Sequence, residues 1–342
     1  VFKILDITKG KMNKRKKIKF SIIMPAKEIN EYIRESIPII LDMNYQDYEI
    51  IILPNEKPAE MPNYLKNEKI KIVPTGRVSP AIKRDIGAKE SLGKYLAFID
   101  DDAYPQKDWL NVAEKTFEQK DAAAIGGPAI TPIDDSLLQK ASGLLFETKF
   151  GGGGMDYRYK PAKNSFYVED FPSVNLIVSK KAFFDAGGFD NDFWPGEDTK
   201  FCLELIKKGE RIWYSNELIV YHHRRKLFFP HLKQIGKYGK PRGYFARKYP
   251  KTSLKLVYLG PSMLVAGYFL LFILGIFNPF VFKIWIALMI IYFVLVAADV
   301  FLRTLNPILA VLAIIAVFLT HLVYGAMFIK GFLSKNFRSQ LR

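Results

Sequence analysis

Short apolar segments alternate with segments of helical periodicity over the first two thirds of the chain, and three long apolar blocks follow. Short apolar runs that stop at Pro, Asn or Asp predict strands. The predicted strands cover residues 19–25, 48–53, 69–73, 95–99, 122–127, 174–178, 212–214 and 219–221, and the predicted helices cover residues 31–43, 80–91 and 197–208. Strands that alternate with helices indicate βαβ units and a mostly parallel sheet. We therefore expect an α/β, Rossmann-like domain followed by an all-α region.

The three apolar blocks cover residues 256–277, 280–302 and 307–329, and the only formally charged residues in this region are Lys283, Asp299 and Arg303. Each block approaches the roughly 20 residues that a helix needs to cross a bilayer. Asn-Pro pairs, which are breaker signals, separate the blocks. A buried helical core is the alternative, but three consecutive blocks of this length favour transmembrane helices.

The chain has 342 residues and a formal net charge of +16, and much of its positive charge precedes the first apolar block. Residues 224–255 hold eleven Lys and Arg and no acidic residue. The positive-inside rule places this stretch and the preceding domain in the cytoplasm, at the cell (inner) membrane. A nucleic-acid patch is the alternative, but a stretch that adjoins a membrane segment is expected to contact anionic lipids, with no nucleic-acid partner.

These features divide the chain into a basic N-terminal segment (1–19), an α/β domain (20–222), a basic juxtamembrane segment (223–255), a membrane region with three apolar helices (256–330) and a basic tail (331–342). Three spans would place this tail outside, against the positive-inside rule. The alternative is that one block lies in the interface or re-enters instead of spanning. A single cysteine, Cys202, excludes an intramolecular disulfide.

Three consecutive carboxylates, Asp100, Asp101 and Asp102, follow a predicted buried strand. They bring negative charge to the carboxyl edge of the sheet, where open α/β sheets bind ligands. Mg²⁺ or Mn²⁺ is the natural partner of clustered carboxylates and of substrate phosphates. The alternative is a solvated turn that caps the next helix. The first strand-to-helix turn has neither a Gly-x-Gly-x-x-Gly nor a Walker motif, so hydride transfer and ATP hydrolysis have no motif behind them.

Further candidate chemistry lies later in the chain. Glu197 and Asp198 open a predicted helix, where they could cap it or direct a carboxylate base into the same cleft. The run 222–225, His-His-Arg-Arg, suits a site for metal and phosphate, with a basic juxtamembrane patch as the alternative. Four glycines at 151–154 cannot form regular structure, and we expect a mobile lid or an ordinary linker.

These motifs together resemble a family 2 glycosyltransferase with the GT-A fold, over residues 20–249. The opening strand ends in Pro-Ala as in the family, and residues 83–87 (Lys-Arg-Asp-Ile-Gly) resemble its Ala-Arg-Asn-x-Gly helix start. Residues 100–102 match its Asp-x-Asp metal motif. Residues 187–190 (Gly-Gly-Phe-Asp) with 196–198 (Gly-Glu-Asp) match its Gly-Gly-Phe-Asp and Glu-Asp pair. The trailing membrane segments resemble the branch that builds surface polysaccharides.

The resemblance implies a membrane-anchored enzyme that transfers a sugar with inversion and with the help of a metal ion. The donor would be a nucleotide-diphospho-sugar, with a UDP-sugar as the first candidate, and the acceptor would be a hydroxyl of a lipid-linked or glycan molecule. The resemblance also implies Asp198 as the general base with Glu197 beside it. A Mn²⁺ or Mg²⁺ ion would bind Asp100, Asp102 and His222. The donor would contact Pro25, Ala26, Glu28, Asn55, Arg84, Asp85, Asp100, Asp101 and Arg225, and the acceptor would contact Asn175, Trp194 and Tyr238.

The chain departs from the family pattern in places. Residues 27–29 are Lys-Glu-Ile where the family has Tyr-Asn-Glu, and Pro54-Asn55 replaces Asp-Asp. Residues 234–238 are a softened form of the Gln-x-x-Arg-Trp motif of processive synthases, so we expect a single transfer. Two alternatives remain: a polyprenyl-phosphate glycosyltransferase whose nucleophile is the lipid phosphate, and a non-catalytic membrane assembly factor. The sequence leaves a homo-oligomer open.

Overall fold

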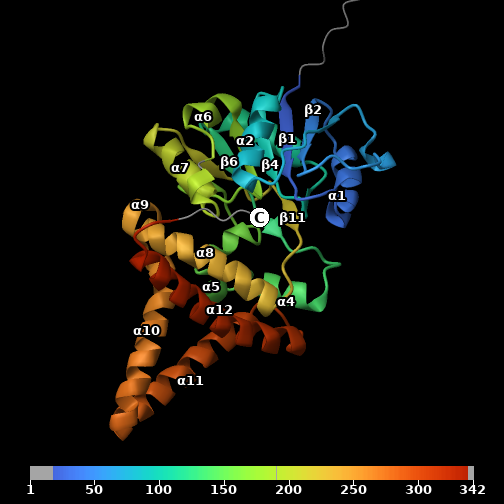
Figure 1. Cartoon of the computed structure of the whole chain (residues 1–342). Helices are drawn as coiled ribbons and strands as arrows, with labels where there is room; N and C mark the ends of the chain where they lie inside the picture. Colours follow the sequence, from blue (N-terminus) through green and yellow to red (C-terminus); the bar gives the residue numbers. More distant parts are fainter. Residues whose placement is uncertain (1–17, 190, 338–342) are drawn as a thin grey trace, which may run out of the picture.

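The computed structural model describes residues 18–189 and 191–337, so most of the predicted N-terminal segment and the last five residues of the tail lie outside the described residues (Figure 1). The main sheet is mixed. Its strands run in the order β3 (Ile70–Ile72), β2 (Tyr48–Leu53), β1 (Phe20–Pro25), β4 (Tyr95–Ile99), β9 (Asn175–Ser179), β6 (Ala124–Gly126), β10 (Ile212–Tyr214) and β8 (Phe166–Val168).

The first four strands of this order are parallel, whereas β9 is antiparallel to both of its neighbours and β8 is antiparallel to β10. The predicted α/β, mostly parallel sheet is confirmed. A second, small sheet has the order β5 (Ala103–Pro105), β11 (Val220–His222) and β7 (Ala129–Ile130). This small sheet was not predicted, and it brings the end of the domain back to the carboxyl edge of β4.

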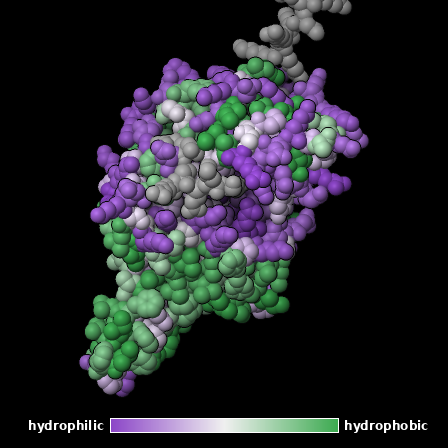
Figure 2. Space-filling model, in the orientation of Figure 1, coloured by the Kyte–Doolittle hydropathy of each residue, from purple (hydrophilic) through white to green (hydrophobic). Residues whose placement is uncertain are grey.

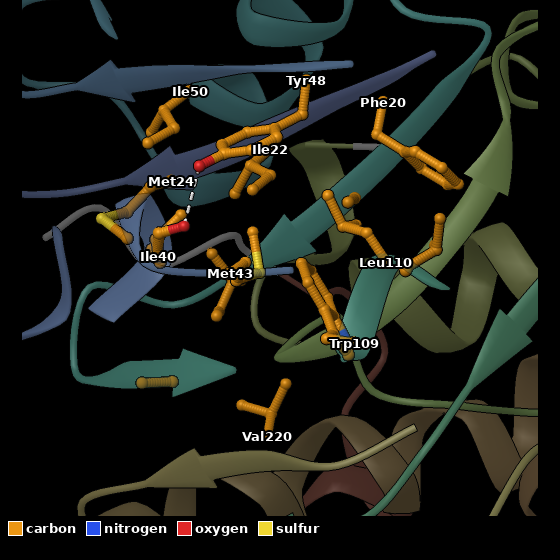
Figure 3. Close-up of a cluster of buried hydrophobic side chains, with 14 of the residues drawn as sticks. Phe20, Ile22, Met24, Ile40, Met43, Tyr48, Ile50, Trp109, Leu110 and Val220 are labelled. Atoms are coloured by element: carbon orange, nitrogen blue, oxygen red, sulfur yellow. Dashed lines mark hydrogen bonds between the residues drawn. The ribbon is translucent and has the colours of Figure 1, made fainter. Parts of the chain in front are cut away.

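Helices cover both faces of the main sheet because side chains alternate along each strand. On β1, Ile22 and Met24 face a core that includes α1 (Glu31–Leu41) and α3 (Trp109–Gln119). Figure 3 shows part of this core, where the Tyr48 hydroxyl donates a hydrogen bond to Ile40 O at 2.8 Å. On the same strand, Ile23 faces the opposite core, which includes α2 (Pro80–Glu90), α6 (Lys180–Asp185) and α7 (Glu197–Lys207).

A helical insertion lies between the α/β domain and the apolar helices (Figure 1). It consists of α4 (Leu137–Glu147), α5 (Lys149–Gly152) and the 3-10 turn η2 (Asp156–Arg158); the other 3-10 turns are η1 (Asn63–Leu65) and η3 (Asn191–Phe193). The expectation that residues 151–154 form no regular structure is wrong for its first half. Gly151 and Gly152 close α5, where a Cβ would lie 2.2 Å from Leu145 O and 2.3 Å from Phe146 O, respectively.

The basic stretch forms α8 (Phe229–Lys248) and the short α9 (Pro250–Ser253), and the apolar blocks form α10 (Leu256–Phe277), α11 (Pro279–Phe301) and α12 (Pro307–Leu333). All three apolar helices are long and apolar enough to cross a membrane. In Figure 1, α10 and α11 form a hairpin that projects away from the α/β domain, while α12 runs beside α8. Figure 2 shows apolar surface over the hairpin and the adjoining underside, and polar surface over the α/β domain.

Helices α8 and α12 run in the same direction and pack closely. At one end, His231 Nε2 and Thr320 Oγ1 lie 3.0 Å apart. Further along, a Cβ on Gly243 would lie 1.9 Å from Phe328 O, and a Cβ on Gly331 would lie 1.9 Å from Lys240 O. Only glycine therefore permits this approach of the two backbones.

Helix α12 packs on the helical insertion and on α8. Its first half packs in one apolar cluster with α4, through Ala313 against residues such as Leu145. Beyond its last turn, Phe337 packs against a cluster formed by Phe193, Tyr244 and Phe245. The third apolar helix thus lies along the insertion and α8, and the chain after it reaches the α/β domain at Phe193.

Candidate functional site

A single cavity of about 990 Å³ runs from the carboxyl edge of β4 down to the apolar helices. Many of the site residues predicted from the sequence line it, namely Pro25, Arg84, Asp100, Asp101, Asp102, Trp194, Glu197, Asp198, His222, Arg225 and Tyr238. Most of the predicted residues therefore converge although they are spread over more than 200 positions of the chain.

Candidate metal ligands meet where the two sheets join. Ligand atoms of Asp100, Asp102 and His222 all lie within 4.8 Å of one another. His222 ends β11, which pairs antiparallel with β5 so that His222 is opposite Ala103, next to Asp102. His222 Nε2 lies 3.1 Å from Asp102 Oδ1. Two carboxylates and an imidazole form a donor set that suits a divalent cation.

Two arginines hold this cluster in place. Arg225 Nη2 lies 2.9 Å from Asp102 Oδ2. Arg224 is buried and its Nη1 lies 2.9 Å from His222 Nδ1. Because a guanidinium can only donate, Nδ1 accepts and the ring proton is on Nε2, facing Asp102. A cation bound by Nε2 would replace this proton.

Arg84 joins the candidate metal ligands to the candidate base. Its Nη2 donates to Asp100 Oδ1 at 2.7 Å, and its Nη1 donates to Glu197 Oε1 at 2.9 Å. The Arg84 side chain is only 5% exposed. Its pair with Glu197, which is 6% exposed, is shielded from water, whereas its other partner, Asp100, is 30% exposed. Burial lowers the pKa of Arg84, but the carboxylates of Asp100 and Glu197 outweigh burial and raise it.

The surroundings of the two carboxyl groups at the start of α7 raise the pKa of each. Burial and the neighbouring Asp198 raise the pKa of Glu197, and Arg84 opposes this rise. Burial and the charge of Asp170 raise the pKa of Asp198. The chain turns sharply before them, because Gly196 has a φ of 127°, a value that side-chain-bearing residues rarely adopt. A carboxylate with a raised pKa is a better proton acceptor.

The loops after β1 and β2 are tied together by Lys83, which is buried. Its Nζ donates to Ala26 O at 2.7 Å, to Leu53 O at 3.1 Å and to Asn55 Oδ1 at 2.8 Å. The predicted donor residues Ala26 and Asn55 thus form the frame of this loop pair. Asp101 accepts a hydrogen bond from Asn30 Nδ2 at 2.8 Å, at the start of α1.

Some predicted site residues lie outside the residues that line the cavity. Asp85 accepts a hydrogen bond from Phe189 N at 2.9 Å and so supports the turn before α7. Asn175 is fully buried; it accepts from Trp109 Nε1 at 3.0 Å and donates to Leu218 O at 2.7 Å. Glu28 is exposed on the loop after β1. The positions of Asp85 and Asn175 give both residues a supporting role in the fold.

The two aromatic candidates for acceptor contact lie at different depths. Trp194 is 7% exposed and precedes α7. Tyr238 is 43% exposed on α8, where its hydroxyl accepts from Gln234 Nε2 at 2.9 Å. Both line the cavity.

Sequence reasoning missed a buried ion cluster beside the base. Arg158 and Arg242 both line the cavity and both lie against Asp170, at 3.6 Å and 2.6 Å, respectively. Thr199 Oγ1 donates to Asp170 Oδ1 at 3.3 Å, directly after Asp198. Burial raises the pKa of Asp170, but Arg242 and Arg158 outweigh burial and lower it. No sequence signal marks these residues, because Arg158 lies in an insertion and Arg242 in a basic stretch.

The sequence of this chain is similar to those of known glycosyltransferases. Residues 21–179 match the family described as glycosyl transferase family 2. A curated relative from Methanococcus voltae, dolichyl N-acetyl-alpha-D-glucosaminyl phosphate 3-beta-D-2,3-diacetamido-2,3-dideoxy-beta-D-glucuronosyltransferase, is 25% identical over 337 residues. The match covers 92% of this chain and 98% of the relative.

Two further likenesses cover different parts of the chain. The glucosyl-dolichyl phosphate glucuronosyltransferase of Haloferax volcanii is 26% identical over 158 residues, which is 42% of this chain and 47% of that protein. Among solved structures, a mannosyltransferase from Pyrobaculum calidifontis in complex with GDP-Man and Mn²⁺ superimposes with a TM-score of 0.63. It covers 93% of this chain and 88% of that chain, at 14% identity. This last likeness shows the shared fold.

Proposed function

Because residues 21–179 match glycosyl transferase family 2 and the chain shares its fold with a solved mannosyltransferase, we propose that it moves a sugar from a nucleotide-diphospho-sugar to a hydroxyl of a lipid-linked glycan. The observation that carries the proposal is one cavity that holds both carboxylate clusters and continues to the apolar helices. The curated relatives that act on dolichyl-phosphate-linked sugars support the acceptor class. A UDP-sugar is the donor we propose first.

The proposed reaction is one in-line displacement at the anomeric carbon, with inversion. Asp198 accepts the proton of the acceptor hydroxyl, and its raised pKa suits that task. Glu197 and Arg84 hold the start of α7 against Asp100, so the base keeps a fixed place relative to the donor. Arg225, beside Asp102, contacts the donor diphosphate. Trp194 and Tyr238 line the acceptor side of the cavity.

The fold family implies a divalent metal, and the donor set fits one, since two carboxylates and an imidazole lie within reach of a single ion. Asp100, Asp102 and His222 would hold Mn²⁺ or Mg²⁺, and such an ion supplies positive charge that stabilises the departing diphosphate. Arg225 supplies part of the charge that balances Asp102.

We place the protein in the cell membrane with its catalytic domain in the cytoplasm. Helices α10 and α11 have 22 and 23 residues, about 33 Å at 1.5 Å per residue, which matches the hydrocarbon core of about 30 Å. Helix α12 lies beside the basic helix α8, which cannot enter that core, so α12 lies in the interface. Two spans return the basic tail to the cytoplasmic side, in agreement with the positive-inside rule.

The test combines donor binding and transfer by the full-length protein in detergent. We expect thermal stabilisation by one of UDP-, GDP- or dTDP-sugars together with Mn²⁺, and transfer from that donor to a dolichyl-phosphate-linked N-acetylglucosamine. Asp198→Asn should lower transfer by ~10²–10⁴-fold with donor binding retained. Asp121→Asn, at a carboxylate whose side chain is 91% exposed, is the matched control and should have no effect.

The outcome also separates the proposal from its nearest rival. If Asp198→Asn transfers sugar to an unsubstituted polyprenyl phosphate at the wild-type rate, no base is needed. The lipid phosphate would then be the nucleophile, and transfer to a sugar hydroxyl would be refuted.

A further inference from the structure

The part of the cavity that lies beyond the base has a different lining from the part that holds the carboxylates. It passes between α5, α8 and α10 and reaches α11 and α12, and its walls there include Phe150, Val257, Leu264, Tyr292 and Tyr324. The helices that supply this wall also present the large apolar surface seen in Figure 2. The cavity therefore connects the base with the apolar part of the molecule.

Positive charge is concentrated where these two parts of the cavity meet. The guanidinium groups of Arg158 and Arg242 share one carboxylate, Asp170, and their side chains are only 11% and 16% exposed. Aromatic rings flank them, since Arg242 lies 4.6 Å from the ring centre of Tyr258 on α10. Two largely buried cations are paired with one carboxylate, so positive charge exceeds negative charge among these three groups. Such an arrangement calls for a further anion.

Hydrogen-bond donors in this region are unused. Within residues 18–189 and 191–337, Arg158 Nε and the Tyr324 hydroxyl are buried and have no hydrogen-bond partner. Tyr324 lies within electrostatic range of Arg242 and Tyr258. A buried donor without a partner costs stability, and both residues line the cavity, so a ligand with acceptor oxygens there would satisfy them.

The order of contacts along the cavity indicates whether an anion bound by Arg158 and Arg242 would belong to the donor or to the acceptor. Asp102 and His222 lie at one end, and Arg84 links Asp100 to Glu197. Asp198 and Thr199 follow, and Thr199 contacts Asp170 with its two arginines. The base thus lies between the candidate metal site and the arginine pair. In an in-line displacement the nucleophile approaches from the side opposite the leaving group, so the arginine pair is on the acceptor side.

We propose that Arg158 and Arg242 bind the phosphate of a lipid-linked acceptor, and that the apolar part of the cavity, from Phe150 to Tyr324, holds the first units of its lipid chain. The inference rests on the proposed function in taking the acceptor to be lipid-linked. Planar guanidinium groups suit phosphate oxygens because they donate two parallel hydrogen bonds. The phosphate anchors the acceptor, and the sugar attached to it points towards Asp198.

The test uses conservative variants of the full-length protein in detergent. Arg158→Lys and Arg242→Lys keep the charge beside Asp170 but lose the planar fork. Arg247→Lys is the matched control, since Arg247 is on the same helix and faces the backbone carbonyls of Ser334 and Lys335 outside the cavity. The probes are dolichyl-phosphate-linked N-acetylglucosamine, a phosphate-free lipid glycoside of the same sugar, and geranylgeranyl monophosphate for binding by thermal shift.

We expect Arg158→Lys and Arg242→Lys to raise KM for the phosphate-linked acceptor by about 10- to 100-fold, the effect of one or two charge-assisted hydrogen bonds. The KM for the phosphate-free acceptor and the hydrolysis of donor should change little, which also shows that the variants fold. Geranylgeranyl monophosphate should stabilise the wild type and Arg247→Lys but neither cavity variant.

Several results would overturn the assignment. An equal loss with the phosphate-free acceptor would make the arginines purely structural, and a rise confined to the KM of the donor would assign them to its diphosphate. Equal competition by phosphatidylglycerol would assign the site to bulk anionic lipid. If geranylgeranyl monophosphate binds in an Arg242-dependent way but no lipid-linked sugar accepts transfer, the subsite stands and the proposed acceptor hydroxyl fails.

Discussion

Arg84 offers the sharpest test of how the two carboxylate clusters are held together. Arg84→Met keeps the length of the side chain but removes the cation between Asp100 and Glu197. The wild-type contacts are short, at 2.7 Å and 2.9 Å, and the side chain is 5% exposed. Breaking a buried ion pair by removing one partner costs about 3–5 kcal/mol, because the other charge stays buried without compensation. We expect a loss of that size in the free energy of unfolding.

The loss should be recovered in part by neutralising the carboxylate left behind. Arg84 is the strongest influence that opposes the effect of burial on Glu197, so without Arg84 the pKa of Glu197 rises further above its ordinary value. Glu197→Gln in the Arg84→Met background removes the need to bury that charge. The double variant should therefore be more stable than Arg84→Met alone, whereas Glu197→Gln alone should be destabilising.

The assay is guanidinium denaturation of the detergent-solubilised protein, followed by tryptophan fluorescence, with a full double-mutant cycle. Mn²⁺ titration is the second readout, because freeing Asp100 changes the candidate metal site. The reasoning is refuted if Arg84→Met costs less than about 1 kcal/mol, the level of an exposed ion pair, or if the effects of the two substitutions simply add.

Four further predictions follow from other parts of the molecule. Asp102→Asn should abolish Mn²⁺-dependent transfer while the melting temperature is kept, and full activity in EDTA would argue against the metal. Burial raises the pKa of Asp198, so the acid limb of the transfer rate should lie above pH ~4, where an ordinary carboxylate titrates; a limb below that value would exclude Asp198 as the base. Burial lowers the pKa of His231 to about 4, against ~6.5 in the unfolded chain. The free energy of unfolding should therefore fall by about 3 kcal/mol as the pH falls from 6.5 to 4, because the unfolded chain binds the proton first. In His231→Asn, this part of the decrease in melting temperature with falling pH should be absent. An unchanged dependence on pH would contradict the lowered pKa of His231. In a Cys202→Ser background, an impermeant maleimide should label Lys283→Cys from outside and Lys335→Cys only from the cytoplasmic side; outside labelling at 335 would mean that α12 spans.

The site motifs could be predicted from the sequence because each lies next to a strand end or a helix start. Asp100 follows an apolar run, and α7 begins at the predicted Glu197. The residues of the Lys-Arg-Asp-Ile-Gly run contact different parts of the fold. Arg84 faces the carboxylates, Asp85 faces the turn at Phe189, and Gly87 allows α2 to pack against Ile23. A spacing of residues cannot reveal that neighbouring side chains on a helix point to different partners.

Long-range pairing could not be predicted. The strand that became β11 was predicted at residues 219–221, and the family resemblance implied His222 as a ligand. Its pairing with β5 was not predicted, because β5 has only three residues and carries too little periodicity to be recognised. The course of α12 likewise depends on glycines that match between α8 and α12, and hydropathy alone does not distinguish an interfacial helix from a spanning one. The roles of Arg158 and Arg242 depend on Asp170, far away in the sequence from Arg242.

The close packing of α8 against α12 sets the reach of the enzyme. Arg242 on α8 is joined through Asp170 to Thr199, so packed contacts connect the proposed base to α8 and α12. If α8 and α12 lie in the interface as proposed, the base stands at one height above the bilayer. Only a hydroxyl within the first sugars above the lipid would then arrive at that height, and the product would carry its new sugar beyond it. Chain growth would stop after one addition as a matter of distance, with no separate device needed to recognise a finished product.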